Sequence, residues 1–404
     1  MAKVHICDEI MGKGKSSAFI NYMIDNDDKR FVYITPYLDE VDRIVCGCKT
    51  RRFQRPVPRN DEGRLEDIHR LLESGQNIAS THAMFKRYTE ETVRLIQSNG
   101  YVLVLDEAFS VVSDMGLSVG DIAMLKGSES IEVDGANVRW TRPEIKESRY
   151  QDVKDTAESK SLIMYDDVFM FWQFPIDVFK AFDEVFVLTY LFSAQMQKNY
   201  FDIHGITYDF VFTDNIDGKY VVVGNKNIAD HQRHLKQLVH IVDNERMNEV
   251  GEKDFSLSSS WYERRRPSDQ AIKHLKANLI NYYTNIVPSK SNLALWTVFE
   301  KRKNWLKGCG YARGFEACNM RATSKHRHRR YLAYCINVFM NPFYKKYFQS
   351  QGAEVDEDKY ALSEMVQWVW RSAIRDGQEI WVYIPSKRMR NLLIGWLDEL
   401  AEEG

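Results

Sequence analysis

The feature that most constrains the fold lies at the start of the chain, where a short apolar segment runs directly into a glycine-rich turn. Residues Val4 to Cys7 are followed by E-I-M-G-K-G-K-S-S at Glu9 to Ser17. A strand, a glycine turn and a helix in this order point several backbone N–H groups at one spot, which suits a polyphosphate. The sequence therefore predicts a phosphate-binding loop between a strand and a helix.

This loop contains the residue types that such a site needs. The residues expected to contact a nucleotide are Gly12, Lys13, Gly14, Lys15, Ser16 and Ser17. Lys15 is expected to neutralise the β and γ phosphates, and the Ser16 hydroxyl to hold Mg²⁺. Glu9 stands where the full eight-residue pattern has its first glycine, so an ordinary glycine-rich turn is the alternative interpretation.

A second apolar segment, V-L-V-L-D-E-A-F at Val102 to Phe109, ends in two adjacent carboxylates. Four apolar residues in a row indicate a buried parallel strand, and ligands bind beyond the carboxyl ends of such strands. We expect Asp106 to hold Mg²⁺ and Glu107 to polarise water. The alternative is an Asp-Glu pair that caps the next helix. Together the two motifs predict hydrolysis of ATP or a similar nucleotide, with Mg²⁺ as the metal.

The composition limits the class of protein. With 404 residues, 44% apolar and 13% aromatic, the chain is long enough for two or three domains with large cores. The 55 basic and 57 acidic residues give a net charge of −2, so a nucleic-acid surface has to be local and a histone-like role is excluded. The cysteines show no paired spacing, and we find neither a signal peptide nor a membrane-length apolar run. We expect a soluble, cytoplasmic protein with no membrane partner.

Apolar stretches alternate with helical patterns in the first half of the chain, which predicts a parallel sheet. The expected strands are 4–7, 31–34, 77–80 and 101–105, and the expected helices begin near Ser16 and after Asp39 and span 84–97. The pattern weakens at about 110–160, where we expect an insertion, and returns as a buried strand at 183–189. The first domain is expected to span 1–215.

A second α/β domain is expected at 216–404, with its first strand beginning near Lys219. Its other expected elements are strands at 292–299, near Phe315 and at 379–385, and helices at 325–338 and 362–376.

Two short polar strings follow strands between the nucleotide motifs. Thr35 and Pro36 belong to I-T-P, and Thr81 and His82 belong to S-T-H. Hydroxyl and N–H groups at such positions bind nucleic-acid phosphates without reading the base sequence. A turn with a helix N-cap is the alternative for both strings.

The chain carries several short motifs in a fixed order: G-K-G-K-S-S, I-T-P, S-T-H and D-E-A-F, then L-T-Y-L-F-S-A at 188–194 and Q-W-V-W-R-S-A-I-R at 367–375. In this ordered set of motifs the chain resembles the superfamily-two helicases and translocases. The resemblance spans nearly the whole chain. It is greatest to the helicase-like ATPases encoded by bacteriophages and prophages. Two further segments of this chain are similar to those proteins: N-M-R-A-T at 319–323 and Y-I-P-S-K-R-M-R at 383–390.

The resemblance implies two RecA-like parallel-sheet domains with a nucleotide cleft between them and a polymer lying across both. It implies that Thr189 to Ala194 couple hydrolysis to movement and that Gln367 and Arg371 form the sixth motif. In the family the second arginine of that motif usually falls where this chain has Ile374, and the third motif is commonly S-A-T rather than F-S-A.

The sixth motif also has a physical rationale. Gln367, Arg371 and Arg375 are spaced i, i+4, i+8, which predicts one stripe of a helix. An arginine supplied from across a cleft stabilises charge that develops during phosphoryl transfer. The alternative is a solvated helix face or an arginine paired with nearby acids.

A basic segment, Arg313 to Arg330, provides the best polymer-contact patch. The residues expected to contact nucleic acid there are Arg321, Thr323, Lys325 and Arg327. Such a cluster supplies salt-dependent affinity without sequence specificity. A solvated helix face is an equal alternative for any single member.

These expectations together predict an ATP-dependent translocase or helicase with a nucleic-acid partner, DNA before RNA, in the cytoplasm of a bacterial host. Proteins of replication or recombination are its expected partners. Two competitors are left open. One is a packaging-type phosphate-loop motor, although no nuclease-like acidic cluster stands out after residue 216. The other is a nucleotide-binding regulatory module that does not hydrolyse.

Overall fold

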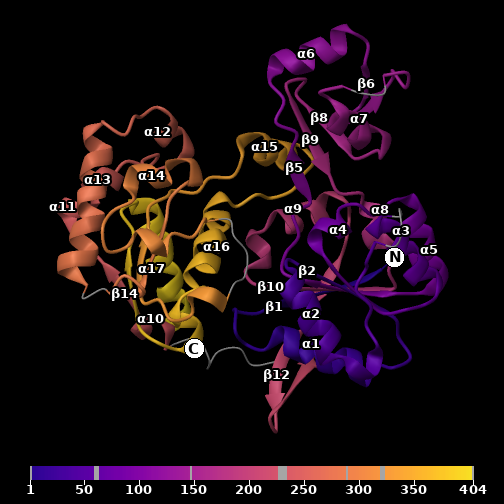
Figure 1. The fold of residues 1–404 in the computed structure, drawn as a ribbon, viewed down its shortest axis with the longest axis horizontal. Coiled ribbons are helices and arrows are strands. Elements are labelled where there is room, and N and C mark those ends of the chain that lie inside the picture. Colours follow the sequence, from indigo (N-terminus) through magenta and orange to yellow (C-terminus); the bar gives the residue numbers. More distant parts are fainter. Residues whose placement is uncertain are drawn as a thin grey trace. The chain divides into compact units, whose positions relative to one another are not determined.

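A computed structural model describes residues 2–58, 63–145, 148–225, 234–287, 290–318 and 324–402. The chain divides into two compact units (Figure 1). The first comprises Met1–Asn225 and Asn341–Val355, and the second comprises Lys226–Met340 and Asp356–Gly404. Among the helices of these described segments, none combines the length and the apolar character needed to cross a membrane.

The first unit is built on a six-stranded, wholly parallel sheet with the order β11-β1-β10-β4-β2-β3. The strands are β1 (Lys3–Asp8), β2 (Phe31–Thr35), β3 (Ile78–Thr81), β4 (Val102–Asp106), β10 (Glu184–Thr189) and β11 (Tyr208–Phe210). The helices are α1 (Lys15–Asp25), α2 (Leu38–Gly47), α3 (Arg64–Glu73), α4 (His82–Phe85), α5 (Glu90–Asn99), α8 (Ile176–Lys180) and α9 (Met196–Ile203). Every residue of β2 and β4 is buried, as expected for central strands covered on both faces.

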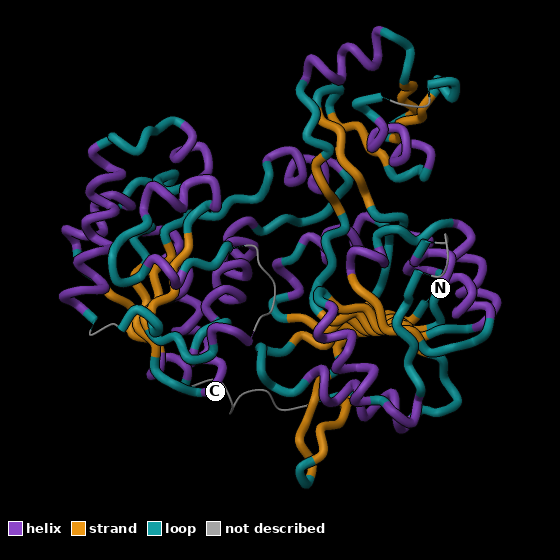
Figure 2. Tube along the Cα trace, in the orientation of Figure 1, coloured by secondary structure: helices purple, strands orange, loops and turns teal. Residues whose placement is uncertain are grey.

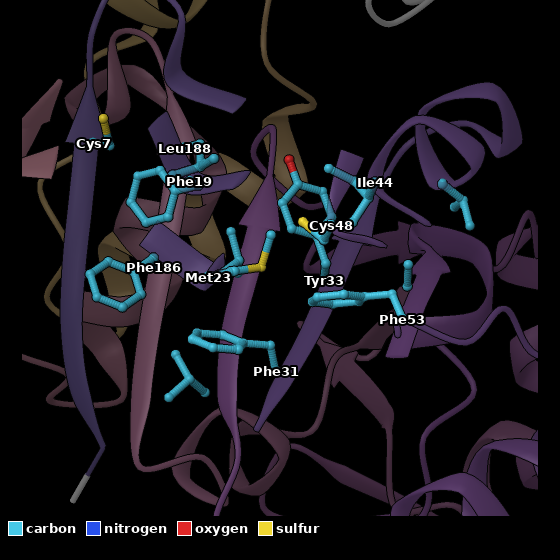
Figure 3. Packing of buried hydrophobic residues seen from close by; sticks show 14 residues of the cluster. Cys7, Phe19, Met23, Phe31, Tyr33, Ile44, Cys48, Phe53, Phe186 and Leu188 are labelled. Atoms are coloured by element: carbon cyan, nitrogen blue, oxygen red, sulfur yellow. The ribbon is translucent and has the colours of Figure 1, made fainter. Parts of the chain in front are cut away.

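Helix α1 is anchored to this sheet by its apolar face (Figure 3). Phe19 and Met23, one helical turn apart, are fully buried and belong to the same cluster as Phe31 of β2 and Phe186 of β10. The Phe19 and Phe186 rings meet edge to face with their centroids 5.2 Å apart. Burial of each such side chain stabilises the fold by about 2 kcal/mol. This packing fixes α1, and with it the loop that precedes the helix, against the sheet.

The helix predicted at 84–97 is wrong as a single element, because α4 and α5 are separate helices. Thr89 interrupts them. Its side chain accepts the Thr92 backbone N–H, and the Thr92 side chain accepts the N–H of Thr89, which is a capping box that starts a new helix.

The insertion forms a second sheet, antiparallel, with the order β5-β9-β8-β7-β6. Its elements are β5 (Val112–Asp114), α6 (Val119–Gly127), β6 (Ile131–Asp134), β7 (Asn137–Trp140), α7 (Gln151–Glu158), β8 (Leu162–Tyr165) and β9 (Phe169–Gln173). Helix α15 (Pro342–Ser350), from much later in the chain, lies beside it (Figure 1). Phe343 stacks on Phe169 with ring centroids 4.5 Å apart, and Gln173 donates to the Tyr347 hydroxyl at 3.1 Å.

The segment at Lys219 does not open a second parallel sheet, which corrects the prediction. β12 (Phe212–Ile216) and β13 (Lys219–Val223) pair with each other as an antiparallel hairpin within the first unit. Asp217 and Gly218 join them with φ of 50° and 84°. An Asp-Gly pair with two left-handed residues is the preferred two-residue hairpin turn.

The second unit contains a four-stranded parallel sheet with the order β14-β17-β16-β15. The strands are β14 (Val239–Val242), β15 (Ala294–Thr297), β16 (Tyr331–Tyr334) and β17 (Ile380–Tyr383). The helices are α10 (Leu235–Leu238), α11 (Glu245–Asn248), α12 (Ser259–Glu263), α13 (Gln270–Asn281), α14 (Lys303–Leu306), α16 (Glu357–Val369) and α17 (Lys387–Glu402). Figure 2 shows these strands gathered as one group within the second unit. The strands expected at 292–299 and 379–385 contain β15 and β17.

The helix predicted at 325–338 is wrong. Residues Ser324–His326 form a short 3-10 turn, and Tyr331–Tyr334 is strand β16. All four residues of β16 are buried between β15 and β17, so pairing within the sheet decides their conformation.

The helix predicted at 362–376 ends too late, because α16 stops at Val369 and Ala373–Asp376 is a separate 3-10 turn. Ser372 between them has an extended ψ of −169°, and the Ala373 N–H donates to the Arg329 carbonyl outside the helix. Gln367, Arg371 and Arg375 therefore do not form one helical stripe.

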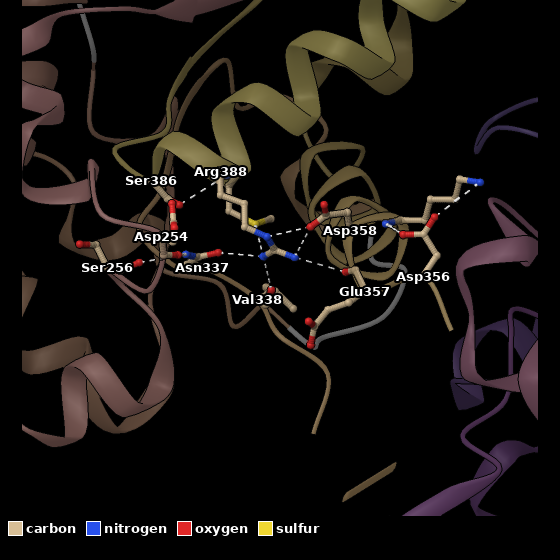
Figure 4. Close-up of polar contacts among 11 residues, drawn as sticks. Asp254, Ser256, Asn337, Val338, Asp356, Glu357, Asp358, Ser386 and Arg388 are labelled. Carbon is tan, nitrogen blue, oxygen red and sulfur yellow. Dashed lines mark hydrogen bonds and ion pairs between the residues drawn. The ribbon is translucent and has the colours of Figure 1, made fainter. Parts of the chain in front are cut away.

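Arg388, from the Y-I-P-S-K-R-M-R string, connects several segments of the second unit (Figure 4). Its guanidinium donates to the Val338 carbonyl at 2.7 Å, to Asn337 Oδ1 at 3.0 Å and to Asp358 Oδ1 at 2.8 Å. Asn337 in turn donates to the carbonyl of Asp254 at 2.7 Å. Arg388 thus joins the first turn of α17 to the start of α16 and to the chain that follows β16.

We expect Arg388→Ala to destabilise the protein by about 3 kcal/mol, because the acceptors that the mostly buried Arg388 guanidinium now contacts would be left without their donor. Chemical denaturation measures this change. The control is Lys387→Ala, which removes a side chain that is 55% exposed and should cost less than about 0.5 kcal/mol. Equal stability of the two variants would contradict the assigned role.

Candidate active site

The glycine-rich loop turns sharply between β1 and α1. Gly12 and Gly14 have φ of 89° and 82°, a left-handed conformation that favours glycine, and Gly14 is the N-cap of α1. The loop therefore connects the carboxyl end of β1, at the edge of the parallel sheet, to the N-terminus of α1, as the sequence predicts.

Lys15 is buried in this loop. Only 8% of the residue is exposed, and its ammonium donates to the carbonyl of Glu9 and, at 3.2 Å, to that of Ile10. A buried ammonium needs acceptors, and here the loop carbonyls supply them. A polyphosphate in the loop would offer stronger, charged acceptors to the same group.

Ser16 and Asp106 meet although they are 90 positions apart. The Ser16 hydroxyl donates to Asp106 Oδ2 at 3.2 Å, and the Tyr33 hydroxyl donates to the same oxygen at 2.8 Å. Burial, together with the charge of neighbouring Glu107, raises the pKa of Asp106 to about 6, against the opposing effect of the Tyr33 hydrogen bond. A bound cation would stabilise the ionised carboxylate.

The donor set at this point fits Mg²⁺. The ion prefers oxygen ligands, typically one or two carboxylates together with phosphate oxygens and water. The Asp106 carboxylate and the Ser16 hydroxyl supply such oxygens beside the phosphate-binding loop.

Glu107 follows directly, with a left-handed φ of 68°. Its backbone N–H donates to the Leu188 carbonyl of β10 at 2.8 Å. A residue other than glycine pays about 1–3 kcal/mol for such a conformation, and such residues cluster at functional sites. The side chain is partly exposed, as a residue that handles water requires.

The segment after β10 joins the ends of two other strands. The Phe192 N–H donates to Asp8 Oδ2 at 3.0 Å, at the end of β1. The Phe109 N–H donates to Gln197 Oε1 at 2.9 Å, just beyond β4. The region expected to couple hydrolysis to movement, Thr189 to Ala194, is therefore hydrogen-bonded to the end of β1, and Gln197 just after it contacts the D-E-A-F motif.

The I-T-P and S-T-H residues lie at the same edge of the sheet. Thr35 is fully buried and Pro36 partly exposed. Thr81 accepts the Met84 N–H at 3.4 Å as the N-cap of α4, which is the alternative that the sequence left open. His82 is buried, and its Nε2 lies 3.0 Å from the Asp106 carbonyl oxygen. His82 thus supports the end of β4.

The sixth-motif residues lie in the second unit. Arg371 is 4% exposed and donates to the Ala317 carbonyl at 3.0 Å. Gln367 donates to Ser363 Oγ at 3.3 Å, and Arg375 is partly exposed in the 3-10 turn. These two arginines do not extend from a common helix face.

The basic segment is largely occupied by internal contacts. Arg327 forms a two-pronged ion pair with Asp376, with one N–O distance of 3.1 Å. Arg329 donates to the Ala294 carbonyl and to a ring nitrogen of His326. Lys325 is exposed. Arg321 and Thr323, the other two predicted contacts, lie outside the described residues.

The sequence did not single out Tyr33 or His82 as supports of Asp106. Tyr33 lies in a buried strand, F-V-Y-I-T, and its hydroxyl in the middle of that strand is the only hint. Strands β2 and β4 are parallel neighbours, and their pairing brings Tyr33 alongside β4, near Asp106. That neighbour relation becomes known only from the sheet order.

A phosphate-binding loop and an aspartate at the edge of one parallel sheet, with a second parallel sheet in the other unit, define a protein with two RecA-like domains. The solved structure titled XPD_APO matches 97% of this chain and 95% of its own, with a TM-score of 0.50 and 12% identity. The structure titled XPD_Helicase matches 97% and 94%, with a TM-score of 0.44 and 11% identity. The likeness to XPD_APO agrees with the expected fold of two RecA-like parallel-sheet domains.

The sequence comparisons identify the family. The chain is 40% identical to the SPbeta prophage-derived uncharacterized protein YonV of Bacillus subtilis (strain 168), over 98% of this chain and 99% of the relative. The YonV middle domain matches residues 112–172, and the YonV C-terminal Rossmann-like domain matches 233–397. The chain belongs to the YonV family. The prophage origin of this relative agrees with the resemblance drawn from the motifs.

Proposed function

We propose that this protein is a nucleic-acid translocase or helicase that hydrolyses ATP. The observation that carries the proposal is the convergence of Lys15, Ser16, Asp106 and Glu107, from two distant motifs, at one edge of the first sheet. Phosphoryl transfer depends mainly on positioning and on charge stabilisation, and these residues provide both.

Each residue has a distinct role in the proposed reaction. Lys15 offsets the negative charge that develops on the β and γ phosphates. Ser16 and Asp106 would hold Mg²⁺, which would supply charge neutralisation to the phosphates. Glu107 orients the attacking water and accepts its proton. We further propose Arg371 as the arginine that stabilises the transition state, with Gln367 assisting. For that role, the Arg371 guanidinium has to give up its hydrogen bond to the Ala317 carbonyl and donate to a phosphate oxygen instead. The role expected for Arg375 depended on a common helix face, which the structure does not have.

The proposed polymer is DNA before RNA. Pro36 and Thr81, which are partly exposed, are proposed as contacts on the first unit, and the buried Thr35 and His82 are proposed only to shape that edge of the sheet. On the second unit, Arg321, Thr323, Lys325 and Arg327 are proposed as backbone contacts. Proteins of replication or recombination in a bacterial host cytoplasm are the proposed partners.

Phosphate release from Mg·ATP tests the proposal, measured alone and with single-stranded DNA, duplex DNA or RNA. We expect hydrolysis that a polymer stimulates, with single-stranded DNA at least as effective as RNA. Strand displacement on a forked duplex would then separate a helicase from a translocase. Binding of ATP without turnover under every polymer would instead favour a regulatory nucleotide-binding module.

Tyr33→Phe should raise the Mg²⁺ concentration needed for half-maximal hydrolysis about tenfold, because Asp106 loses a donor that favours its ionised form. A Mg²⁺ titration at saturating ATP measures this. The matched control is Tyr101→Phe, which removes a buried hydroxyl that donates to the Gln76 carbonyl at 3.0 Å, away from the site. Equal Mg²⁺ requirements in both variants would show that Tyr33 has no part in the metal site.

A further inference from the structure

The β12–β13 hairpin packs against the phosphate-binding loop. The chain leading into it runs beside β1, where Ile6 is opposite Phe210 in the parallel register. The Val211 N–H then donates to the Ile6 carbonyl at 3.0 Å. Continued at the same offset, this register places Thr213 opposite Glu9, at the point where β1 becomes the loop.

Thr213 holds both ends of the loop. Its N–H donates to Glu9 Oε2 at 2.9 Å, its hydroxyl donates to the same oxygen, and the hydroxyl lies 3.5 Å from the Lys13 carbonyl oxygen. Glu9 and Thr213 are 7% and 1% exposed. A carboxylate in a phosphate-binding loop would repel a polyphosphate unless it is turned away and its charge is offset by donors. Thr213 supplies two such donors.

The second strand of the hairpin contacts the helix that follows the loop. The ring of Tyr220 lies over Gly14, where an added Cβ would overlap it. The Tyr220 carbonyl accepts from Asn21 Nδ2 at 2.8 Å, and Lys219 forms an ion pair of 2.8 Å with Asp25. The hairpin therefore contacts the strand end, the loop and α1 as far as its last residue, Asp25.

We propose that this hairpin holds the loop in its nucleotide-binding conformation, with Thr213 as a positioning residue that acts through Glu9. The inference rests on the proposed function and adds to it. The described hydrogen bonds of the hairpin reach the loop and α1, whereas Glu107 follows β4, so loss of the hairpin should weaken nucleotide binding and leave the chemical step intact.

The test compares full-length Thr213→Val and Thr213→Ser with the wild type. Hydrogen exchange of the loop amides reports the conformation without nucleotide, and steady-state ATP hydrolysis separates KM from kcat. In Thr213→Val we expect the hydrogen-exchange rate of the loop amides and the KM for ATP each to rise about tenfold, with kcat within about twofold of wild type. Thr213→Ser keeps the hydroxyl and should restore both values.

A second variant, Asn21→Ala, removes a hairpin contact from the α1 side and leaves Thr213 intact. We expect its KM to rise about threefold in the same direction. Unchanged loop exchange or unchanged KM in Thr213→Val would overturn the inference, as would an equal effect of Thr213→Ser. Wild-type protein that neither binds nor hydrolyses ATP would instead contradict the proposed function, and the exchange comparison would still decide whether the hairpin holds the loop.

Discussion

Replacing Glu107 with glutamine is expected to lower the rate of ATP hydrolysis about a thousandfold while ATP binding is retained. Glutamine keeps the size of the side chain but cannot accept a proton from the attacking water, and general-base catalysis contributes about 10²–10⁴ to such rates. Single-turnover hydrolysis and equilibrium binding of ATP, measured on the same preparation, separate the two effects.

A matched control is available because Glu129 is also a glutamate with a left-handed φ, 53°, and is exposed in the insertion. Glu129→Gln changes the same charge in a similar backbone conformation away from the site. It should leave hydrolysis within about twofold of wild type. If Glu107→Gln hydrolysed ATP as fast as Glu129→Gln, Glu107 could not be the base.

Lys15→Ala is expected to lower hydrolysis at least about a hundredfold and to weaken ATP binding as well. The ammonium is expected to contact the phosphates in the ground state and in the transition state, and removal of one charge-stabilising donor typically costs about 10²–10³ in rate. Binding of a fluorescent ATP analogue and phosphate release measure the two losses.

Lys154 provides the control for removal of a buried lysine. It is 9% exposed in the insertion and donates to the carbonyls of Pro143 and Ile145 at 3.3 and 2.7 Å, much as Lys15 donates to its loop. Lys154→Ala should lower thermal stability without changing the affinity for ATP. Loss of ATP binding in both variants would mean that destabilisation, and not the phosphate contact, explains Lys15→Ala.

The central strands of the first sheet were predictable because they are buried on both faces and therefore appear as continuous apolar runs. Val102–Leu105 is such a run, and Asp106, the next residue, is the last residue of the strand, as expected. The loop residues Gly12 and Gly14 were predictable for a related reason, since their left-handed backbone requires a residue type that is visible in the sequence.

Elements decided by pairing with distant segments were not predictable. The Y-L-A-Y segment at Tyr331–Tyr334 fits a helix or a strand locally, and its place between β15 and β17 decides the outcome. The same holds for Thr213, which contacts Glu9 across 204 positions because β11 lies beside β1. The end of α16 before Arg371 likewise depends on the bond between Ala373 and Arg329.

The central claim is that one edge of the first sheet binds a Mg²⁺-bound triphosphate. A crystal structure with Mg²⁺ and a non-hydrolysable ATP analogue tests it most directly. We predict the γ-phosphate at Lys15 Nζ, with the metal beside Ser16 Oγ and the Asp106 carboxylate. A nucleotide bound elsewhere, with Lys15 still bonded to the carbonyls of Glu9 and Ile10, would contradict the claim.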